Sequence, residues 1–468
     1  MTLVVRLGLL ALIIFLVLIE SSQLSADPPE TPYDGPSPTP AQLAWQEAEL
    51  GFLVCYELHT FNEGRYVQSQ ARVAPIEDAD QFNPEELDTD QWIRAVKAGG
   101  GRFAILTASH ESGFRLWQSD ANPFCLKNVA WGNGERDIVA EFVASCRKYD
   151  VAPGIYLGTR WNARLGVYDF KVTERSTITQ EEYNRMIEAE VEEICTRYGD
   201  LFEIWFDGGA YGPKDGGPDV LSVVEEHQPG TLFYHNYQRA DARWGGTESG
   251  MVPYPCWATM PFDGYEGHKS ESHANGFRLL KFGDPEGMFW CPAMSDAPLR
   301  SFHGNEWFWE PDQDQLVLPV SSLLTKYERS VGHNSTLILG LTPDTRGLVP
   351  DADVARLTEF GNALERRYAT PAVSTSGTGD DLLLTLDSPL MIDRLILQEE
   401  IFEGERVRAY RLEAKVDDEW RPIGEGTCIG QKRIQQFEPI MTDAIRLLID
   451  ELIADPKIKN FAAFEVEP

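Results

Sequence analysis

The strongest candidates for chemistry in this sequence are carboxylates that follow short apolar runs. Asp207 comes directly after the apolar segment 201–206 and before Gly208 and Gly209. A carboxylate lifted from a strand end, beside aromatic rings and two glycines, can act as a nucleophile toward a closely bound substrate. An Asp that only begins a tight turn gives the same pattern, so this position alone leaves both interpretations open.

Two further polar clusters follow apolar runs of the same kind. Three such clusters on separate strand ends exceed what turns alone would produce, and they indicate a shared site. The two clusters are His110 with Glu111 after segment 102–107, and Cys55, Glu57 and His59 within segment 51–61.

Glu248 is the best local candidate for a second acidic group. Two-step cleavage of a glycosidic bond uses one carboxylate as nucleophile, while another protonates the leaving oxygen and then activates water. Glu248 lies in a glycine-rich loop after the next strand, and Arg243 lies in the same loop. We expect Arg243 to hold a substrate hydroxyl or the ionised Asp207. A loop Glu that is simply solvated is the alternative.

The elements that must position these groups alternate between amphipathic helices and short apolar strands. This order predicts a parallel sheet, and residues 41–368 are long enough to close it as a (β/α)8-like, TIM-type barrel. A doubly wound open sheet is the alternative, although no glycine-rich phosphate loop opens a helix. In a barrel the strand ends named above share one rim. The expected helix–strand pairs are 89–98 with 102–107, 137–149 with 153–157, 181–198 with 201–206, and 220–227 with 231–234.

The composition changes after the last barrel helix. Residues 369–380 are rich in Pro, Ser, Thr and Gly, which is typical of a linker. Residues 381–468 contain short alternating strands, and they predict an antiparallel β-sandwich. This domain is either a carbohydrate-binding module or a buttress for the barrel. The sequence shows no exposed aromatic platform in it, which favours the buttress.

The N-terminus resembles a targeting signal. Arg6 precedes an apolar run over residues 7–19, which is short for a membrane span and typical of a signal peptide. We therefore expect a signal peptide over residues 1–26, a Pro-rich linker over 27–40, and export to the periplasm or the medium. An uncleaved anchor is the alternative.

Composition excludes several classes of function. The chain of 468 residues has 41 Lys and Arg against 74 Asp and Glu, a formal charge of −33, which disfavours binding to nucleic acid or to an anionic membrane. Its 7 cysteines show no zinc or disulfide spacing, and its 8 histidines no ligand spacing, so no metal or cofactor is expected. The 12 Trp, 16 Tyr and 23 Phe suit a carbohydrate site, where rings stack on sugar C–H faces.

Several sequence motifs, in a fixed order over nearly the whole mature chain, match those of a known family. The chain resembles the α-L-fucosidases of glycoside hydrolase family 29, and most closely their α-1,3/1,4 subgroup. Several ordered matches are more specific than any single motif. They are residues 49–52 with 60–61, AGG at 98–100 with ASHESGFRLW at 108–117, WFDG at 205–208, RWGGTE at 243–248, GHN at 332–334 with PDTRGL at 343–348, and the C-terminal segments 395–399, 404–407 and 429–434.

The resemblance implies a retaining exo-glycosidase that hydrolyses α-L-fucosides from an oligosaccharide or glycoconjugate. Asp207 is the implied nucleophile and Glu248 the implied acid/base. The groups expected to bind or line the sugar are Cys55, His59, His110, Glu111, Tyr156, Trp161, Trp205 and Arg243.

Several positions depart from the family pattern. Cys55 stands where the family's first strand usually has His, Arg65-Tyr66 where Glu-Trp is expected, Glu111 in place of the second of two histidines, and Met294 in place of a later Glu. Such changes in hydrogen-bonding partners can alter sugar specificity strongly. The alternatives are therefore a glycosidase redirected to another sugar, or a non-catalytic carbohydrate-binding protein on this scaffold.

Overall fold

The larger part of the molecule is a barrel of eight parallel strands. The computed structural model describes residues 32–62, 66–234, 238–263, 273–300 and 307–467. The strands follow one another around the sheet in chain order, with β7 and β8 at its two ends, so the predicted barrel architecture is confirmed. They are β1 (Leu50–Val54), β2 (Phe103–Ser109), β3 (Ala152–Leu157), β6 (Glu203–Phe206), β7 (Leu232–Tyr234), β8 (Arg243–Trp244), β11 (Ala293–Pro298) and β12 (Ser335–Leu341).

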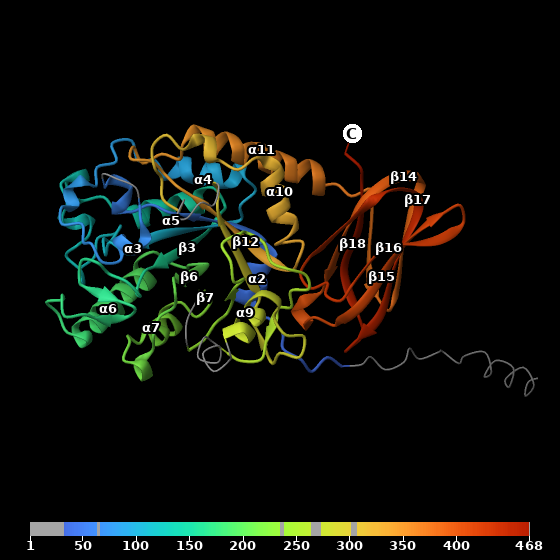
Figure 1. Cartoon of the computed structure of the whole chain (residues 1–468), viewed down its shortest axis with the longest axis horizontal. Helices are drawn as coiled ribbons and strands as arrows, with labels where there is room; N and C mark the ends of the chain where they lie inside the picture. Colours follow the sequence, from blue (N-terminus) through green and yellow to red (C-terminus); the bar gives the residue numbers. More distant parts are fainter. Residues whose placement is uncertain (1–31, 63–65, 235–237, 264–272, 301–306, 468) are drawn as a thin grey trace, which may run out of the picture.

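Amphipathic helices cover the outside of this sheet (Figure 1). In α4, Asp88 caps the helix by accepting a hydrogen bond from the Gln91 amide, and Trp92, Ile93 and Val96 bury one face against the strands. All four helix–strand pairs expected from the sequence are present. The helices are α3 (Gln68–Ala71), α4 (Thr89–Ala98), α5 (Ile138–Lys148), α6 (Gln180–Arg197), α7 (Val220–His227), α9 (His273–Phe282), α10 (Val320–Glu328) and α11 (Asp351–Tyr368).

A further helix, α2 (Pro40–Ala48), packs against the barrel at the N-terminal ends of its strands. Thr39 caps it, and Pro40 occupies its first turn, so the predicted Pro-rich linker ends where this helix begins. Trp45 is fully buried and donates from Nε1 to Glu203 at 2.9 Å. Burial raises the pKa of Glu203 to about 8. The base of the barrel is therefore closed by packed side chains.

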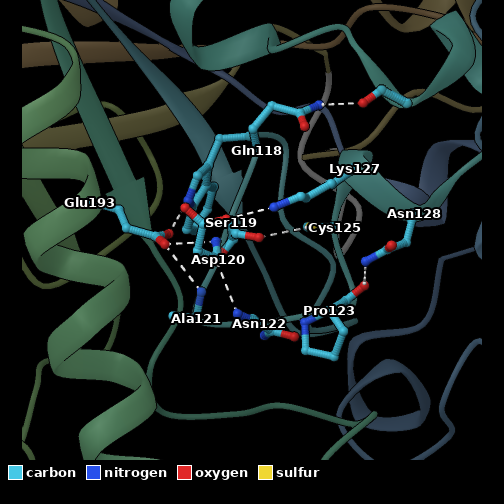
Figure 2. Close-up of polar contacts among 12 residues, drawn as sticks. Gln118, Ser119, Asp120, Ala121, Asn122, Pro123, Cys125, Lys127, Asn128 and Glu193 are labelled. Carbon is cyan, nitrogen blue, oxygen red and sulfur yellow. Dashed lines mark hydrogen bonds and ion pairs between the residues drawn. The ribbon is translucent and has the colours of Figure 1, made fainter.

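Buried carboxylates of α6 fix the long loop that follows β2. Glu193 accepts hydrogen bonds from the backbone amides of Asp120 at 2.7 Å and Ala121 at 3.1 Å, as Figure 2 shows. One turn earlier, Glu190 pairs with the buried guanidinium of Arg115 at 2.8 and 2.9 Å. The segment that carries His110 is thus anchored on its C-terminal side.

The C-terminal residues form an antiparallel sheet of six strands beside the barrel (Figure 1). β14 and β17 are long, and shifts of register along them let the sheet enclose its own apolar core. This agrees with the predicted β-sandwich, although the strands are longer than the sequence indicates. The strands are β13 (Val373–Thr378), β14 (Asp381–Glu399), β15 (Val407–Val416), β16 (Glu419–Gly426), β17 (Arg433–Leu452) and β18 (Lys457–Glu465).

The stretch predicted to be a linker, 369–380, needs correction. It contains β13, which pairs with β18 at the edge of the sheet. Its side chains alternate between half-buried and exposed positions, a period of two that its Ser, Thr and Gly content conceals.

Short elements complete the fold, and the predicted signal peptide, residues 1–26, lies outside the described residues. Within the described ranges, no helix combines the length and apolar character needed to cross a bilayer. The remaining strands are β4 (Val167–Tyr168) with β5 (Lys171–Val172), and β9 (Thr259–Met260) with β10 (Phe289–Trp290).

Candidate active site

A pocket opens at the C-terminal ends of the barrel strands. It encloses about 500 Å³, part of which is open to solvent. Strands β1, β2, β3, β6 and β11, the loops after them and the loop after β8 supply its walls. Six of the ten residues proposed from sequence line it, namely Cys55, His110, Tyr156, Trp205, Asp207 and Glu248.

Asp207 reaches the pocket because the chain turns sharply after β6. Gly208 and Gly209 have φ values of 66° and 92°, which L side chains rarely adopt. A Cβ on Gly208 would also lie 2.7 Å from Cδ of Arg160. The pKa of Tyr156 is raised well above its usual range. Burial is the largest cause, and the negative charge of Asp207 is the second. The carboxylate of Asp207 therefore faces the ring that forms the adjacent wall.

Glu248 faces the same pocket in a less polar environment. Burial raises its pKa, and the charge of Asp207 adds to this, while the hydrogen bond from Trp307 and the charge of Arg72 act in the opposite direction. Trp307 Nε1 donates to its Oε2 at 3.1 Å. A carboxyl group that keeps its proton beside a second carboxylate is suited to general acid catalysis.

Two buried nitrogens in the pocket have no hydrogen-bond partner among the described residues. They are Nδ1 of His110 and Nε1 of Trp205. The His110 ring stacks on Tyr156 with centroids 5.8 Å apart and meets the edge of Phe308 at 5.0 Å. Buried polar groups are normally paired, so Nε1 of Trp205 indicates a polar ligand held between aromatic rings, whereas Nδ1 of His110 lies 3.8 Å from Oε1 of Glu57.

His59, proposed from sequence as a sugar-binding residue, lies behind His110 rather than in the pocket wall. It pairs with the fully buried carboxylate of Glu57, which also accepts from Ser112 and lies 3.8 Å from Nδ1 of His110. Burial opposes ionisation of Glu57, but the charge of His59 and its hydrogen bond lower the pKa of Glu57 to about 2. The same pairing overcomes the effect of burial on His59 and raises its pKa. The ionised carboxylate of Glu57 therefore faces both His59 and His110.

Glu111 and Trp161 also lie one contact away from the pocket. Glu111 accepts from the Tyr66 hydroxyl at 2.8 Å and from Arg72 Nε at 2.7 Å, so it fixes Tyr66, which lines the pocket. The Arg72 guanidinium stacks over Trp161 at 3.6 Å. Trp161 in turn borders the space beside Gly208, 3.4 Å from the Cβ position there.

Arg243 does not have the role proposed from the sequence. Its side chain is 1% exposed and lies outside the pocket. Its nitrogens donate to the carbonyls of Leu280 at 2.9 Å and Trp257 at 2.7 Å, and also to that of Cys291. Arg243 lies on β8, where the side chains of neighbouring residues point to opposite faces. Trp244 points inward, and Arg243 therefore points outward to the loops behind the barrel.

The positions that depart from the family pattern have different environments. Cys55 is 2% exposed, lines the pocket and donates its thiol to the carbonyl of Leu53. Burial, followed by the charge of Asp207, raises the pKa of this thiol well above its usual value, so it is neutral. Met294 is fully buried in the core of the barrel, and Arg65 lies outside the described residues.

Sequence reasoning missed several residues of the pocket wall. Asp296 follows Met294 by two positions in β11, so the alternation of a strand could have indicated it. Trp307 and Phe308 lie in a loop without periodicity, where the sequence carries no such signal. The missed residues are Leu53, Tyr66, Gln68, Thr107, Asp296, Trp307 and Phe308.

Known proteins are similar to this chain in sequence and in fold. The family model described as alpha-L-fucosidase matches residues 44–275. The "Putative alpha-L-fucosidase 1" of Oryza sativa subsp. japonica is 30% identical, over 92% of this chain and 85% of its own length. The chain belongs to the α-L-fucosidase family. It is a glycoside hydrolase, and this membership favours an enzyme over a non-catalytic sugar-binding protein.

Solved structures agree with this assignment to glycoside hydrolase family 29. A "putative alpha-L-fucosidase" from Bacteroides thetaiotaomicron VPI-5482 is 50% identical with a TM-score of 0.90, over 93% of this chain and 100% of that one. A glycoside hydrolase 29 family member from an unknown rumen bacterium is 27% identical with a TM-score of 0.79, over 93% of this chain and 78% of that one. Similarity to fucosidases thus extends over both the barrel and the C-terminal sheet.

Proposed function

We propose that this α-L-fucosidase family member is a retaining exo-fucosidase that removes terminal α-L-fucose from glycans. One observation carries the proposal: Asp207 and Glu248 line the same pocket at the C-terminal rim of the barrel. The roles follow from their environments. Asp207 is partly exposed and available as a nucleophile, while burial raises the pKa of Glu248 and keeps its proton available.

The reaction proceeds in two displacements. Asp207 attacks the anomeric carbon as Glu248 donates its proton to the departing glycosidic oxygen, which gives a covalent fucosyl-enzyme and the shortened glycan. Ionised Glu248 then takes a proton from water, the resulting hydroxide displaces Asp207, and fucose leaves with its original anomeric configuration. Each displacement inverts the carbon, so two of them retain it.

The pocket suits a single sugar ring. Tyr66, Tyr156, Trp205 and Phe308 present aromatic faces, and Nε1 of Trp205 is a buried nitrogen without a hydrogen-bond partner among the described residues. A preference for α-1,3/1,4 linkages is proposed from the sequence motifs. Export after cleavage of a signal peptide over residues 1–26 is proposed from the N-terminal pattern.

The test is time-resolved hydrolysis of p-nitrophenyl α-L-fucoside beside a panel of other aryl glycosides. We expect wild-type turnover of the fucoside, and loss of at least about 10³-fold in Asp207→Ala, because the covalent step is removed. Asp215→Ala is the matched control, since Asp215 is an exposed Asp on the segment after the site. Exclusive turnover of another glycoside would refute fucose as the substrate. Wild-type-like turnover by Asp207→Ala would refute the nucleophile.

A further inference from the structure

A third carboxylate, Asp296, faces the pocket with Asp207 and Glu248. It lies on β11, two residues after Met294, and both side chains point into the barrel. Asp296 is 5% exposed, so what remains accessible is directed into the pocket that it lines.

The carboxyl group of Asp296 has few hydrogen-bond partners. Trp244, on the neighbouring strand β8, donates from Nε1 to Oδ1 at 2.9 Å. Within the described part of the chain, no second side chain donates to this carboxyl group; its own backbone amide is the further donor, and its remaining capacity faces the pocket. The indole also fixes which oxygen faces the sugar.

The electrostatic setting of the pocket opposes a third negative charge. Three carboxyl groups line one small space, and the described residues that line it include no Lys or Arg. Like charges in a buried site cannot all be ionised, so the most buried member keeps its proton. Burial, together with the charges of Glu248 and Asp207, raises the pKa of Asp296 well above its usual value.

We infer that Asp296 is a neutral carboxylic acid whose Oδ2–H donates a hydrogen bond to a hydroxyl group of the bound sugar. The inference rests on the proposed function and adds a substrate-binding residue to it. Asp207 needs its charge to attack, and Glu248 needs its proton to be transferred. Asp296 instead contributes a fixed donor that neither gains nor loses a proton during the reaction.

The first test compares two substitutions of Asp296. Asp296→Asn keeps the shape, an oxygen that accepts from Trp244, and an N–H donor in the place of Oδ2–H. We expect its kcat/KM on the fucoside to stay within about threefold of wild type. Asp296→Ala removes the donor, and we expect kcat/KM to fall by about tenfold or more, with weaker inhibition by free L-fucose. Thermal unfolding of both variants controls for damage to the fold.

The outcomes separate this inference from the proposed function. If Asp296→Asn loses as much activity as Asp296→Ala, the sugar requires an ionised acceptor and the inference is wrong. If both variants match wild type, Asp296 does not contact the sugar. A wild-type enzyme without fucoside turnover would contradict the proposed function instead.

The second test needs no substrate. Infrared difference spectra between Glu248→Gln and the double variant Glu248→Gln/Asp296→Asn report the carboxyl of Asp296, because all other carboxyl groups are common to both proteins and cancel. We expect the C=O stretch of a protonated carboxyl group at neutral pH, present only while Asp296 is present. A carboxylate stretch in its place would overturn the inference even in an inactive protein.

Discussion

Two regions of this molecule differ in how their carboxyl groups are bonded: the candidate active-site pocket, and the junction between the barrel and the C-terminal sheet. At the junction, Glu399 is 1% exposed and accepts three backbone amides, from Arg406 at 2.7 Å, Val407 at 3.0 Å and Gly430 at 2.9 Å. The neighbouring Glu405, also 1% exposed, accepts the Ala258 amide and the Asn334 side chain from the barrel. Burial and the charge of Glu399 raise the pKa of Glu405 to about 7.

The pocket carboxyl groups have far fewer partners. Glu248 accepts one indole N–H from Trp307, and Asp296 accepts one from Trp244. The carboxylate oxygens at the junction thus accept several hydrogen bonds, whereas those in the pocket accept few from the protein. A saturated buried carboxylate stabilises the fold, whereas an unsaturated one keeps oxygens available for a substrate. Asp296, at 5% exposed, is nearly as buried as Glu399, so the number of donors rather than exposure distinguishes these two groups.

The largest expected effect that tests this contrast comes from the pocket. Glu248→Ala should lower fucoside turnover by about 10²–10⁴-fold, the usual contribution of a general acid/base. Added azide should restore turnover of an activated aryl fucoside, because azide attacks the fucosyl-enzyme without base assistance. The product should be the α-fucosyl azide, since two displacements retain the anomeric centre.

Asp207→Ala provides the matched control for this rescue. Azide that replaces the nucleophile makes a single displacement, so any product formed there should be the β-fucosyl azide. NMR of the products distinguishes the two anomers. A β anomer from Glu248→Ala would show that the two carboxylates have been assigned the wrong way round.

The next effect concerns stability and leaves chemistry unchanged. Glu399→Ala leaves three buried backbone N–H groups without an acceptor. We therefore expect the free energy of unfolding to fall by about 3–5 kcal/mol. The folded fraction should keep the kcat/KM of wild type, because Glu399 is far from the pocket in the fold. Denaturant titration and active-site titration measure the two quantities separately.

Glu400 provides the control for this substitution. It is the adjacent carboxylate, and its side chain makes no hydrogen bond to any described residue, so Glu400→Ala should change stability little. Loss of kcat/KM in folded Glu399→Ala would show that the junction affects catalysis in the pocket. The junction carboxylates could then no longer be assigned to stability alone.

Sequence reasoning predicts those parts of the site that regular strands position. Asp207 and His110 follow strands whose apolar runs are clear, Tyr156 lies near the end of such a strand, and the order of helices and strands places these ends on one rim. The exceptions have physical causes. Arg243 and Trp244 differ by one position on β8, which sends their side chains to opposite faces, and a two-residue strand gives no periodicity to choose between them.

Contacts made by irregular segments were not predictable. Trp307 donates to Glu248 from a segment distant in sequence and without periodicity. Glu111 resembles a sugar-binding residue by position, yet Tyr66 and Arg72 occupy both of its oxygens. The edge strand β13 was missed because its Ser, Thr and Gly residues resemble those of a linker. Each of these errors concerns a contact with a residue distant in the sequence, and the pattern of neighbouring residues does not encode such contacts.

The smallest expected effect concerns His333, which lies at the junction and donates from Nδ1 to the carbonyl of Val252 at 2.8 Å. Burial, with the charges of Arg433 and Arg329, lowers the pKa of His333 to about 4 from the usual 6.5. Because the folded state resists protonation, the unfolded state binds the proton first as pH falls below 6.5. Stability should therefore decrease between pH 6.5 and 4, by up to about 3 kcal/mol from this residue.

His333→Asn isolates that contribution, because Asn stays neutral over this range and its side-chain N–H can still reach the carbonyl of Val252. Denaturant unfolding of both proteins at pH 7 and pH 4.5 gives the difference, so other groups that titrate cancel. We expect a shallower loss of stability in the variant. Equal slopes would show that water reaches His333 at the junction, and the junction would then be less fully sealed than its saturated carboxylates indicate.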